Sequence, residues 1–210
     1  ATYYQWGRKD PQPYTKDVAE GSFVFEDAPS GVTFGYAIQH PGTYFGYISR
    51  PGVFVYYDTW LAGENLNLWS ANANSYEFNN GPVVKTIYDP CPPGFKVPAP
   101  KAFTGFTTTG QYTSNREEFN VSGTWNNGWN FNNKRTNPNA TIYFPALGYR
   151  YGDNLSLSGL NNSGSYWAAS VGPYNGFRGY NLSISENWIY NTSNENNPAS
   201  GYCVRPVADN

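Results

Sequence analysis

The sequence shows almost no helical spacing of apolar residues. Its apolar residues come instead in brief, aromatic-rich runs that are broken by Gly, Pro and Asn. Aromatic and β-branched residues favour extended backbone, whereas Gly, Pro and Asn favour turns. The pattern therefore predicts short strands joined by long loops. The predicted strands are 22–25, 53–57, 95–97, 142–144, 165–169, 180–184, 188–190 and 202–207.

Two segments are helix candidates. The stronger one covers 98–106, where a Pro suited to a first helical turn precedes Lys101, and a weaker one covers 60–70. No internal repeat and no linker divides the 210 residues. We therefore expect one α+β domain over residues 1–210, dominated by strands and coil, with one or two short helices.

Segment 180–190 carries the clearest alternation of apolar and polar residues. If Leu182, Ile184 and Ile189 point into the core, Asn181, Trp188 and Tyr190 point toward the opposite, exposed face. Ser-Glu-Asn at 185–187 has the residues of a hairpin turn. Tyr, Trp, Asn and Ser together resemble the composition of antibody loops. We therefore expect a binding face here, and the alternative is that the two rings cover the core under a long loop.

Charge and titratable residues exclude several classes of function. The formal net charge is −2, so there is no basic field for nucleic acid or an anionic membrane. No apolar run reaches the roughly 18 residues of a membrane span. One His, in a turn-like Gln-His-Pro-Gly setting, and two Cys disfavour a zinc site or a Ser-His-Asp triad. The carboxylates Asp89, Glu117, Glu118, Asp153 and Glu186 lie in no catalytic string. We expect no enzyme, no cofactor and no metal site.

Asn is concentrated after Thr124, above all in the stretch 122–139. Asn tolerates left-handed backbone and hydrogen-bonds within turns, so the stretch predicts a loop. One interpretation is a surface loop held in place by Trp125 and Trp129. The other is a ligand platform, in which the rings stack on a partner and the amides bond to it.

Five strings together resemble a known family. They are YYQWGRKDP at 3–11, YDPCPPGFKVP at 88–98, YFPALGYR at 143–150, GSYWAAS at 164–170 and GYCVRPV at 201–207. In this order they are similar to the Fibrobacter succinogenes major paralogous domain and its relatives in Bacteroides-type surface proteins. The resemblance implies a C-type-lectin-like fold whose first and last strands pair. It also implies the C-terminal part of a longer exported lipoprotein or pilus-tip adhesin, outside the cell on a bacterial surface. The missing initial Met fits such an excised domain.

The same resemblance implies a non-enzymatic, adhesin-like function. Segments 174–181 and 187–197 look like the variable part of proteins diversified by retroelements, displayed to bind a protein or glycan. The calcium-binding strings of sugar-binding relatives, Glu-Pro-Asn among them, are absent, so sugar binding would use rings and amides. The alternative function is a structural assembly module of a pilus or surface layer, with pilus subunits or upstream domains as partners. The predicted ligand-binding residues are Tyr174, Asn175, Phe177, Arg178, Asn181, Asn187, Trp188, Tyr190, Asn191, Asn194, Trp125 and Trp129.

The resemblance also bears on whether the two cysteines form a disulfide. Pairing of early and final strands would bring Cys91 close to Cys203, and an exported protein permits a disulfide. Relatives with a C-terminal Cys, however, tend to carry it where Pro206 stands here, and Ser is usual at position 203. A disulfide and two separate thiols both remain open at this point.

Overall fold

The computed structural model of the chain describes residues 2–13, 24–28, 30–46, 59–63, 65–73, 81–172, 178–191 and 195–210. The predicted strand 53–57 and residues 22 and 23 of the predicted strand 22–25 lie outside these residues. The predicted binding residues Tyr174, Asn175, Phe177 and Asn194 lie outside them as well.

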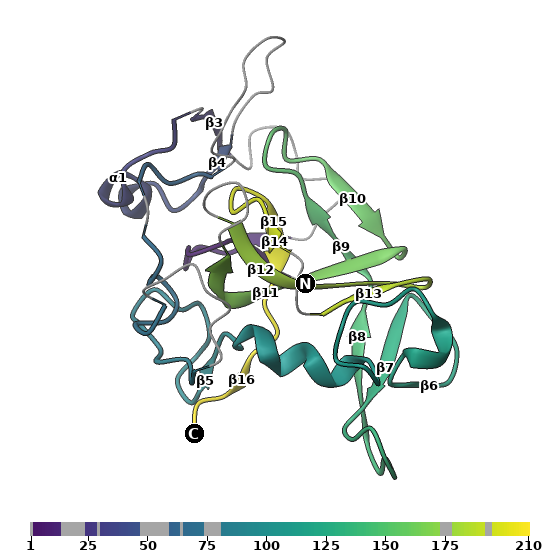
Figure 1. The fold of residues 1–210 in the computed structure, drawn as a ribbon. Coiled ribbons are helices and arrows are strands. Elements are labelled where there is room, and N and C mark those ends of the chain that lie inside the picture. The colour runs from purple at the N-terminus through teal and green to yellow at the C-terminus, as the bar shows by residue number, and fades with distance from the viewer. Residues whose placement is uncertain are drawn as a thin grey trace.

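A nine-stranded sheet forms the centre of the molecule. Its two longest strands, β11 (Ser163–Gly172) and β12 (Arg178–Ser185), pair antiparallel in the middle of the ribbon (Figure 1). The sheet continues on one side of this pair through β9 (Leu147–Arg150), β15 (Gly201–Cys203), β1 (Thr2–Gln5) and β2 (Gln12–Pro13), with β10 (Leu157–Leu160) beside β9. On the other side β12 pairs with β13 (Ile189–Tyr190) and β14 (Glu195–Asn196).

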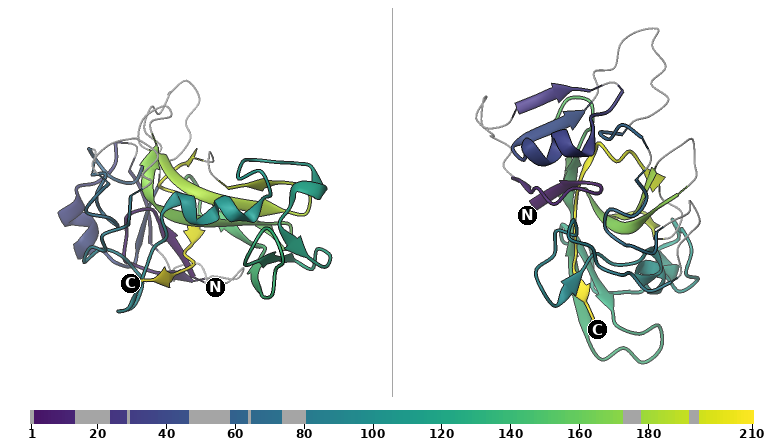
Figure 2. Two further views of the ribbon diagram at one scale, coloured as in Figure 1. Left: turned by 60° about the horizontal axis from the view of Figure 1, so that its bottom comes forward. Right: turned by 90° about the vertical axis from the view of Figure 1, so that its left-hand side faces the viewer.

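Smaller elements surround the sheet. At one end, the parallel pair β3 (Val24–Asp27) and β4 (Thr43–Gly46) lies beside α1 (Phe34–Gln39), and the far end carries β6 (Val121–Ser122), β7 (Gly128–Asn132) and β8 (Thr141–Pro145) (Figures 1 and 2). The remaining elements are the pair β5 (Phe95–Lys96) and β16 (Val207–Ala208) and the 3-10 helices η1 (Pro100–Phe106) and η2 (Arg116–Glu118). No helix in the described ranges is long and apolar enough to cross a membrane.

The expected α+β, C-type-lectin-like fold is wrong. The described residues form sixteen strands in four sheets, with one six-residue α-helix and two short 3-10 helices, which is a β-rich fold. The predicted helix 98–106 is the 3-10 helix η1. The described residues of 60–70 form bends, turns and bridges instead of a helix. Gly63, Asn65 and Asn67 explain this outcome, because Gly and Asn favour turns over helix interiors.

Most of the predicted strands that fall on described residues are present. The predicted strands 95–97, 142–144, 165–169, 180–184 and 188–190 correspond to β5, β8, β11, β12 and β13. The predicted strand 202–207 is instead two strands, because β15 ends at Cys203 and β16 joins β5 in another sheet. The hairpin turn predicted at 185–187 is confirmed: the Ser185 N–H donates to the Trp188 carbonyl at 2.9 Å, and β13 returns beside β12.

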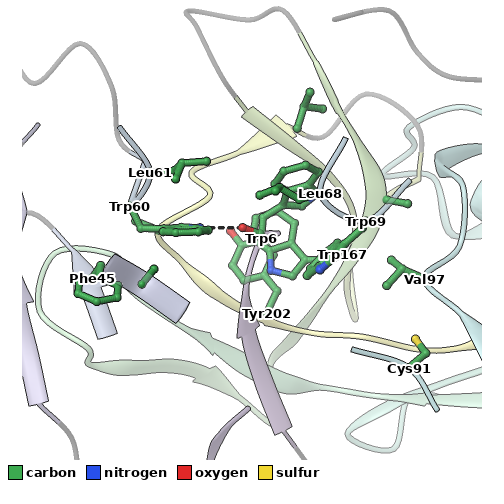
Figure 3. Close-up of a cluster of buried hydrophobic side chains, with 14 of the residues drawn as sticks. Trp6, Phe45, Trp60, Leu61, Leu68, Trp69, Cys91, Val97, Trp167 and Tyr202 are labelled. Carbon is green, nitrogen blue, oxygen red and sulfur yellow. Dashed lines mark hydrogen bonds between the residues drawn. The ribbon is translucent and has the colours of Figure 1, made fainter. Parts of the chain in front are cut away.

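Two hydrophobic clusters lie on opposite faces of β11. Trp167 and Ala169 belong to the cluster that we call cluster I, whereas Tyr166 and Ala168 belong to cluster II. Cluster I is built around Trp6, Phe45, Trp60, Trp69, Trp167 and Tyr202 (Figure 3). Cluster II is built around Tyr3, Trp129, Phe131, Phe144, Tyr166, Leu182, Ile184 and Ile189.

The buried tryptophans are all hydrogen-bonded to backbone. A buried indole N–H without an acceptor would cost free energy, and in this protein each one donates to a carbonyl from a distant part of the chain. Trp60 donates to the Trp6 carbonyl at 2.7 Å, a bond visible in Figure 3, and Trp167 donates to the Tyr4 carbonyl at 2.7 Å. The indoles therefore stabilise the packing and also fix strand positions. The other three indole N–H groups donate in the same way: that of Trp6 to the Ala168 carbonyl, that of Trp69 to the Arg8 carbonyl and that of Trp129 to the Ser185 carbonyl.

Candidate ligand-binding site

A cavity of about 650 Å³ opens over one half of the sheet. It lies on the face of β11 and β12 that carries Trp167, because alternation places Ser163 and Ser165 on the same side as Trp167. Cluster I covers the other half of this face. Tyr202 belongs to both regions, since it lines the cavity and stacks on Trp167 with ring centroids 4.2 Å apart. The volume falls in the range of small-molecule sites in proteins.

Hydroxyls and amides form the floor of the cavity. Ser165 and Ser183 are direct partners across β11 and β12, and their Oγ atoms lie 3.0 Å apart. Asn181 Nδ2 donates to Ser183 Oγ at 2.7 Å, and its Oδ1 accepts from Asn196 Nδ2 at 3.0 Å. The network fixes the orientation of these polar groups before any ligand arrives.

Three tyrosines form one wall. Tyr149 meets Tyr151 and Tyr202 edge to face, with centroids 5.1 and 5.8 Å apart, and the hydroxyls of Tyr149 and Tyr151 lie 3.1 Å apart. Burial raises the pKa of Tyr149, and its hydrogen bond to Tyr151 adds to the rise. Burial likewise raises the pKa of Tyr202, with a further contribution from Tyr149. Both hydroxyls therefore stay protonated at neutral pH and can donate hydrogen bonds.

The β12–β13 turn supplies the opposite wall. Its rings are Trp188 and Tyr190, both half-buried, with centroids 5.4 Å apart in an edge-to-face contact. Ser185 Oγ accepts from the backbone N–H of Asn187 and Trp188, which fixes the turn. Tyr112 stacks on Tyr190 with ring centroids 4.0 Å apart, and this contact supports the Tyr190 ring. Both rings are held in place by these contacts.

Opposite charges also line the cavity. Arg178 begins β12, and its positive charge acts against the rise in the pKa of Tyr202. Asp153 lies in the turn after β9, next to Tyr151, and its Oδ1 atom is buried without a hydrogen-bond partner. A buried carboxylate oxygen of this kind favours a hydrogen-bond donor nearby.

The structure brings three of the predicted binding residues to the cavity, namely Arg178, Trp188 and Tyr190. Asn187 is exposed at the tip of the β12–β13 turn and does not line it. The expectation that Asn181 is exposed is wrong, since its side chain is 3 % exposed and hydrogen-bonded within the floor.

Other predicted residues lie elsewhere in the molecule. Asn191 is 1 % exposed, and its Nδ2 donates to Thr107 Oγ1 at 3.0 Å, so the two side chains join the segment after β13 to the end of η1. Trp129 is 1 % exposed within cluster II. Trp125 packs edge to face on Trp129 with centroids 5.4 Å apart, outside the cavity lining. The stretch 122–139 thus matches the interpretation of a surface loop held by tryptophans only in part, because residues 128–132 of it form strand β7.

Both cysteines are free thiols in the structure. Cys91 lies in cluster I and Cys203 in cluster II, on opposite faces of the sheet. Strand β1 does pair with β15, with Tyr3 opposite Cys203. That pairing brings Tyr3, and not Cys91, beside Cys203, so the suggested disulfide is absent.

Sequence reasoning missed the floor and the tyrosine wall. Ser183 alternates with Leu182 and Ile184, so the same pattern that selected Asn181 pointed to it. Ser165, Tyr149 and Tyr202 lie in the strings that carry the family resemblance, which assigned no binding role to them. Asp153 carries no sequence signal, because only the turn after β9 brings it to the cavity.

The described residues contain no group of three or more His, Cys, Asp or Glu side chains that could hold a metal ion. Comparison of the chain with known protein families, with curated proteins and with solved structures finds no match.

Proposed function

We propose that this chain is a non-enzymatic, adhesin-like binding domain, exported to a bacterial surface, that recognises a protein or glycan ligand. The observation that carries the proposal is the cavity of about 650 Å³, whose floor is polar and whose two walls are aromatic. Rigid rings with prearranged hydrogen-bonding groups are the usual composition of recognition sites. The serine hydroxyls of the floor bond to each other and to Asn181, which suits a fixed binding surface better than an activated nucleophile.

Binding to an array that carries both glycans and bacterial or host surface proteins tests this function. We expect Trp188→Ala and Tyr190→Ala each to weaken binding about tenfold, because truncated aromatic anchors typically cost more than 1 kcal/mol. Trp125→Ala is the matched control, since Trp125 is also a half-buried tryptophan but lies outside the cavity. Binding that survives both cavity variants would move the site elsewhere, and no binding to either class of ligand would contradict the proposal.

A second candidate is an assembly module of a pilus or surface layer. Strand β8 favours it, because β8 is the outer strand of the β6–β7–β8 sheet and its residues Ile142 and Tyr143 are exposed. Open strand edges can pair with a strand of another chain.

A further inference from the structure

The charges and hydrogen bonds of the cavity narrow the chemistry of its ligand. Arg178 and Asp153 are the charged side chains among the described lining residues, so their formal charges cancel. The Asp153 carboxylate has an oxygen without a hydrogen-bond partner. A ligand hydroxyl can donate to the part of the Asp153 carboxylate that lines the cavity, whereas the cancelling charges of Asp153 and Arg178 give an acidic ligand no net attraction.

The walls add a second requirement. Tyr112 covers one side of Tyr190, and Trp188 is held by the turn that Ser185 fixes. A flat ligand with an apolar face can lie against these rings without moving them, so little side-chain entropy is lost on binding. Across the cavity, the Tyr149 and Tyr151 hydroxyls offer polar contacts to the edge of such a ligand.

We propose that the ligand is a neutral saccharide, a deeper claim that rests on the proposed function. A pyranose ring has an apolar C–H face, which matches the rings of Trp188 and Tyr190. It has hydroxyls around its rim that both donate and accept, which match Asp153 and the Ser165–Ser183 floor. The contacts require side chains of this chain alone, so binding is independent of added metal ions.

The experiment titrates the purified chain with neutral oligosaccharides (lactose, mannotriose, cellotriose and chitotriose) and with acidic ones (sialyllactose and trigalacturonate), using calorimetry. Saturation-transfer NMR then shows which ligand protons lie near protein rings. We expect a neutral saccharide to bind best, with saturation reaching its ring C–H protons and with no change in EDTA. Trp188→Ala should weaken binding about tenfold and Asp153→Asn about fivefold, whereas Trp125→Ala should stay within about twofold.

The possible results separate the saccharide proposal from the proposed binding function. Trp188→Phe keeps an aromatic ring, so partial binding by this variant separates loss of stacking from loss of fold, as does an unchanged thermal midpoint for Asp153→Asn. A preference for the acidic saccharides, or loss of binding in EDTA, would overturn the saccharide proposal. Array binding to a protein that no saccharide inhibits would also overturn it and leave the proposed function standing. Failure of every ligand class on the array would remove both.

Discussion

Arg8 connects the N-terminal segment to strand β4 through one buried side chain. Arg8 is 3 % exposed, and its guanidinium donates to Gln5 Oε1 at 3.1 Å, to the Thr43 carbonyl at 2.5 Å and to Asp10 Oδ2 at 2.7 Å. It also lies 4.9 Å from the centroid of the Phe45 ring. Burial lowers the pKa of Arg8, and the hydrogen bond to Asp10 acts in the opposite direction. The planar fork of an Arg can satisfy all these acceptors at once, which a Lys ammonium cannot do.

We therefore expect Arg8→Lys to lower the free energy of unfolding by about 2–4 kcal/mol, because several buried acceptors lose their donor. Urea denaturation followed by tryptophan fluorescence measures this change. Arg135→Lys is the control: Arg135 is exposed and donates to the Thr104 carbonyl, so the change should stay within about 0.5 kcal/mol. Equal effects of the two substitutions would show that the Arg8 contacts do not stabilise the fold.

The reactivity of the Cys91 and Cys203 thiols tests chemically whether these side chains are buried. Burial raises the pKa of Cys203 from 9.0 to about 12 and also raises the pKa of Cys91. The folded state therefore holds the Cys203 proton between pH 9 and about 12, and the stability that this burial contributes falls as pH rises through that window. At pH 8 we expect both thiols to react slowly with Ellman's reagent in the native protein, because the thiolate is the nucleophile.

In urea without reductant, two thiols per chain should react rapidly. Cys91→Ala and Cys203→Ala should each reduce that number to one. A value of zero would indicate a disulfide, and fast reaction of the native protein would contradict the burial of the thiols.

Strand β12 shows how one element separates two differently packed faces. Leu182 and Ile184 enter cluster II, and Ser183 faces the cavity. Gly179 stands where the rings of cluster I come closest: a Cβ at this position would lie 2.7 Å from Trp167 Cζ3 and 2.8 Å from Trp6 Cδ1. The two indoles therefore leave no room for a side chain at this point of the strand.

We expect Gly179→Ala to lower the free energy of unfolding by about 1–3 kcal/mol, as overpacking does in other cores. Gly35→Ala is the matched control, because Gly35 lies inside α1 and a Cβ there meets nothing within 4 Å. That substitution should raise stability by about 0.4–1 kcal/mol by restricting the unfolded chain. Chemical denaturation of both variants gives the comparison, and a neutral Gly179→Ala would contradict the close packing of the two indoles.

At the scale of secondary-structure elements, the local sequence pattern predicted the long strands best. The alternation at 180–184 predicted β12 correctly, because every second residue meets the same core. The predicted helix 98–106 is the 3-10 helix η1, whereas the helix predicted at 60–70 is absent because Gly63, Asn65 and Asn67 favour turns. The helix α1 was not predicted: it spans only six residues and is capped by the Thr33 side chain, which is too little sequence for a periodic signal.

The sequence predicted the binding site only in part, because the burial of two predicted residues depends on contacts between distant segments. Alternation placed Asn181 on the correct face of β12, but β14 pairs with β12 there and Asn196 bonds to Asn181, so the side chain is buried. Asn191 is buried because β13 also forms a bridge with the segment around Thr113. These burials depend on long-range pairings that local sequence does not encode. They also make Asn181 and Asn191 poor positions for diversification, since substitution would leave buried partners unsatisfied.

Across the whole molecule, the central sheet is covered unequally on its two faces. Among the described residues, cluster II covers the face of Leu182 and Ile184, whereas cluster I covers the Trp167 end of the other face. The remaining half of that face is the cavity, bounded by the turn after β9 and the β12–β13 turn. A rigid sheet thus presents its polar residues at the base of a site whose walls come from turns, an arrangement that favours fixed recognition of a ligand.

The assembly function makes a different prediction at this scale, because it requires an adhesive surface. The open edge at β8 is short: Thr141, Ile142 and Tyr143 are exposed, and Pro145 ends the strand without a backbone donor. Specific interfaces usually bury more than about 1,000 Å², which so short an edge does not supply. We therefore expect sedimentation velocity to show a monomer from micromolar to high micromolar concentration, with no change in Ile142→Lys. Concentration-dependent association that Ile142→Lys abolishes, together with unchanged behaviour of Trp188→Ala, would instead favour assembly through β8 over ligand binding in the cavity.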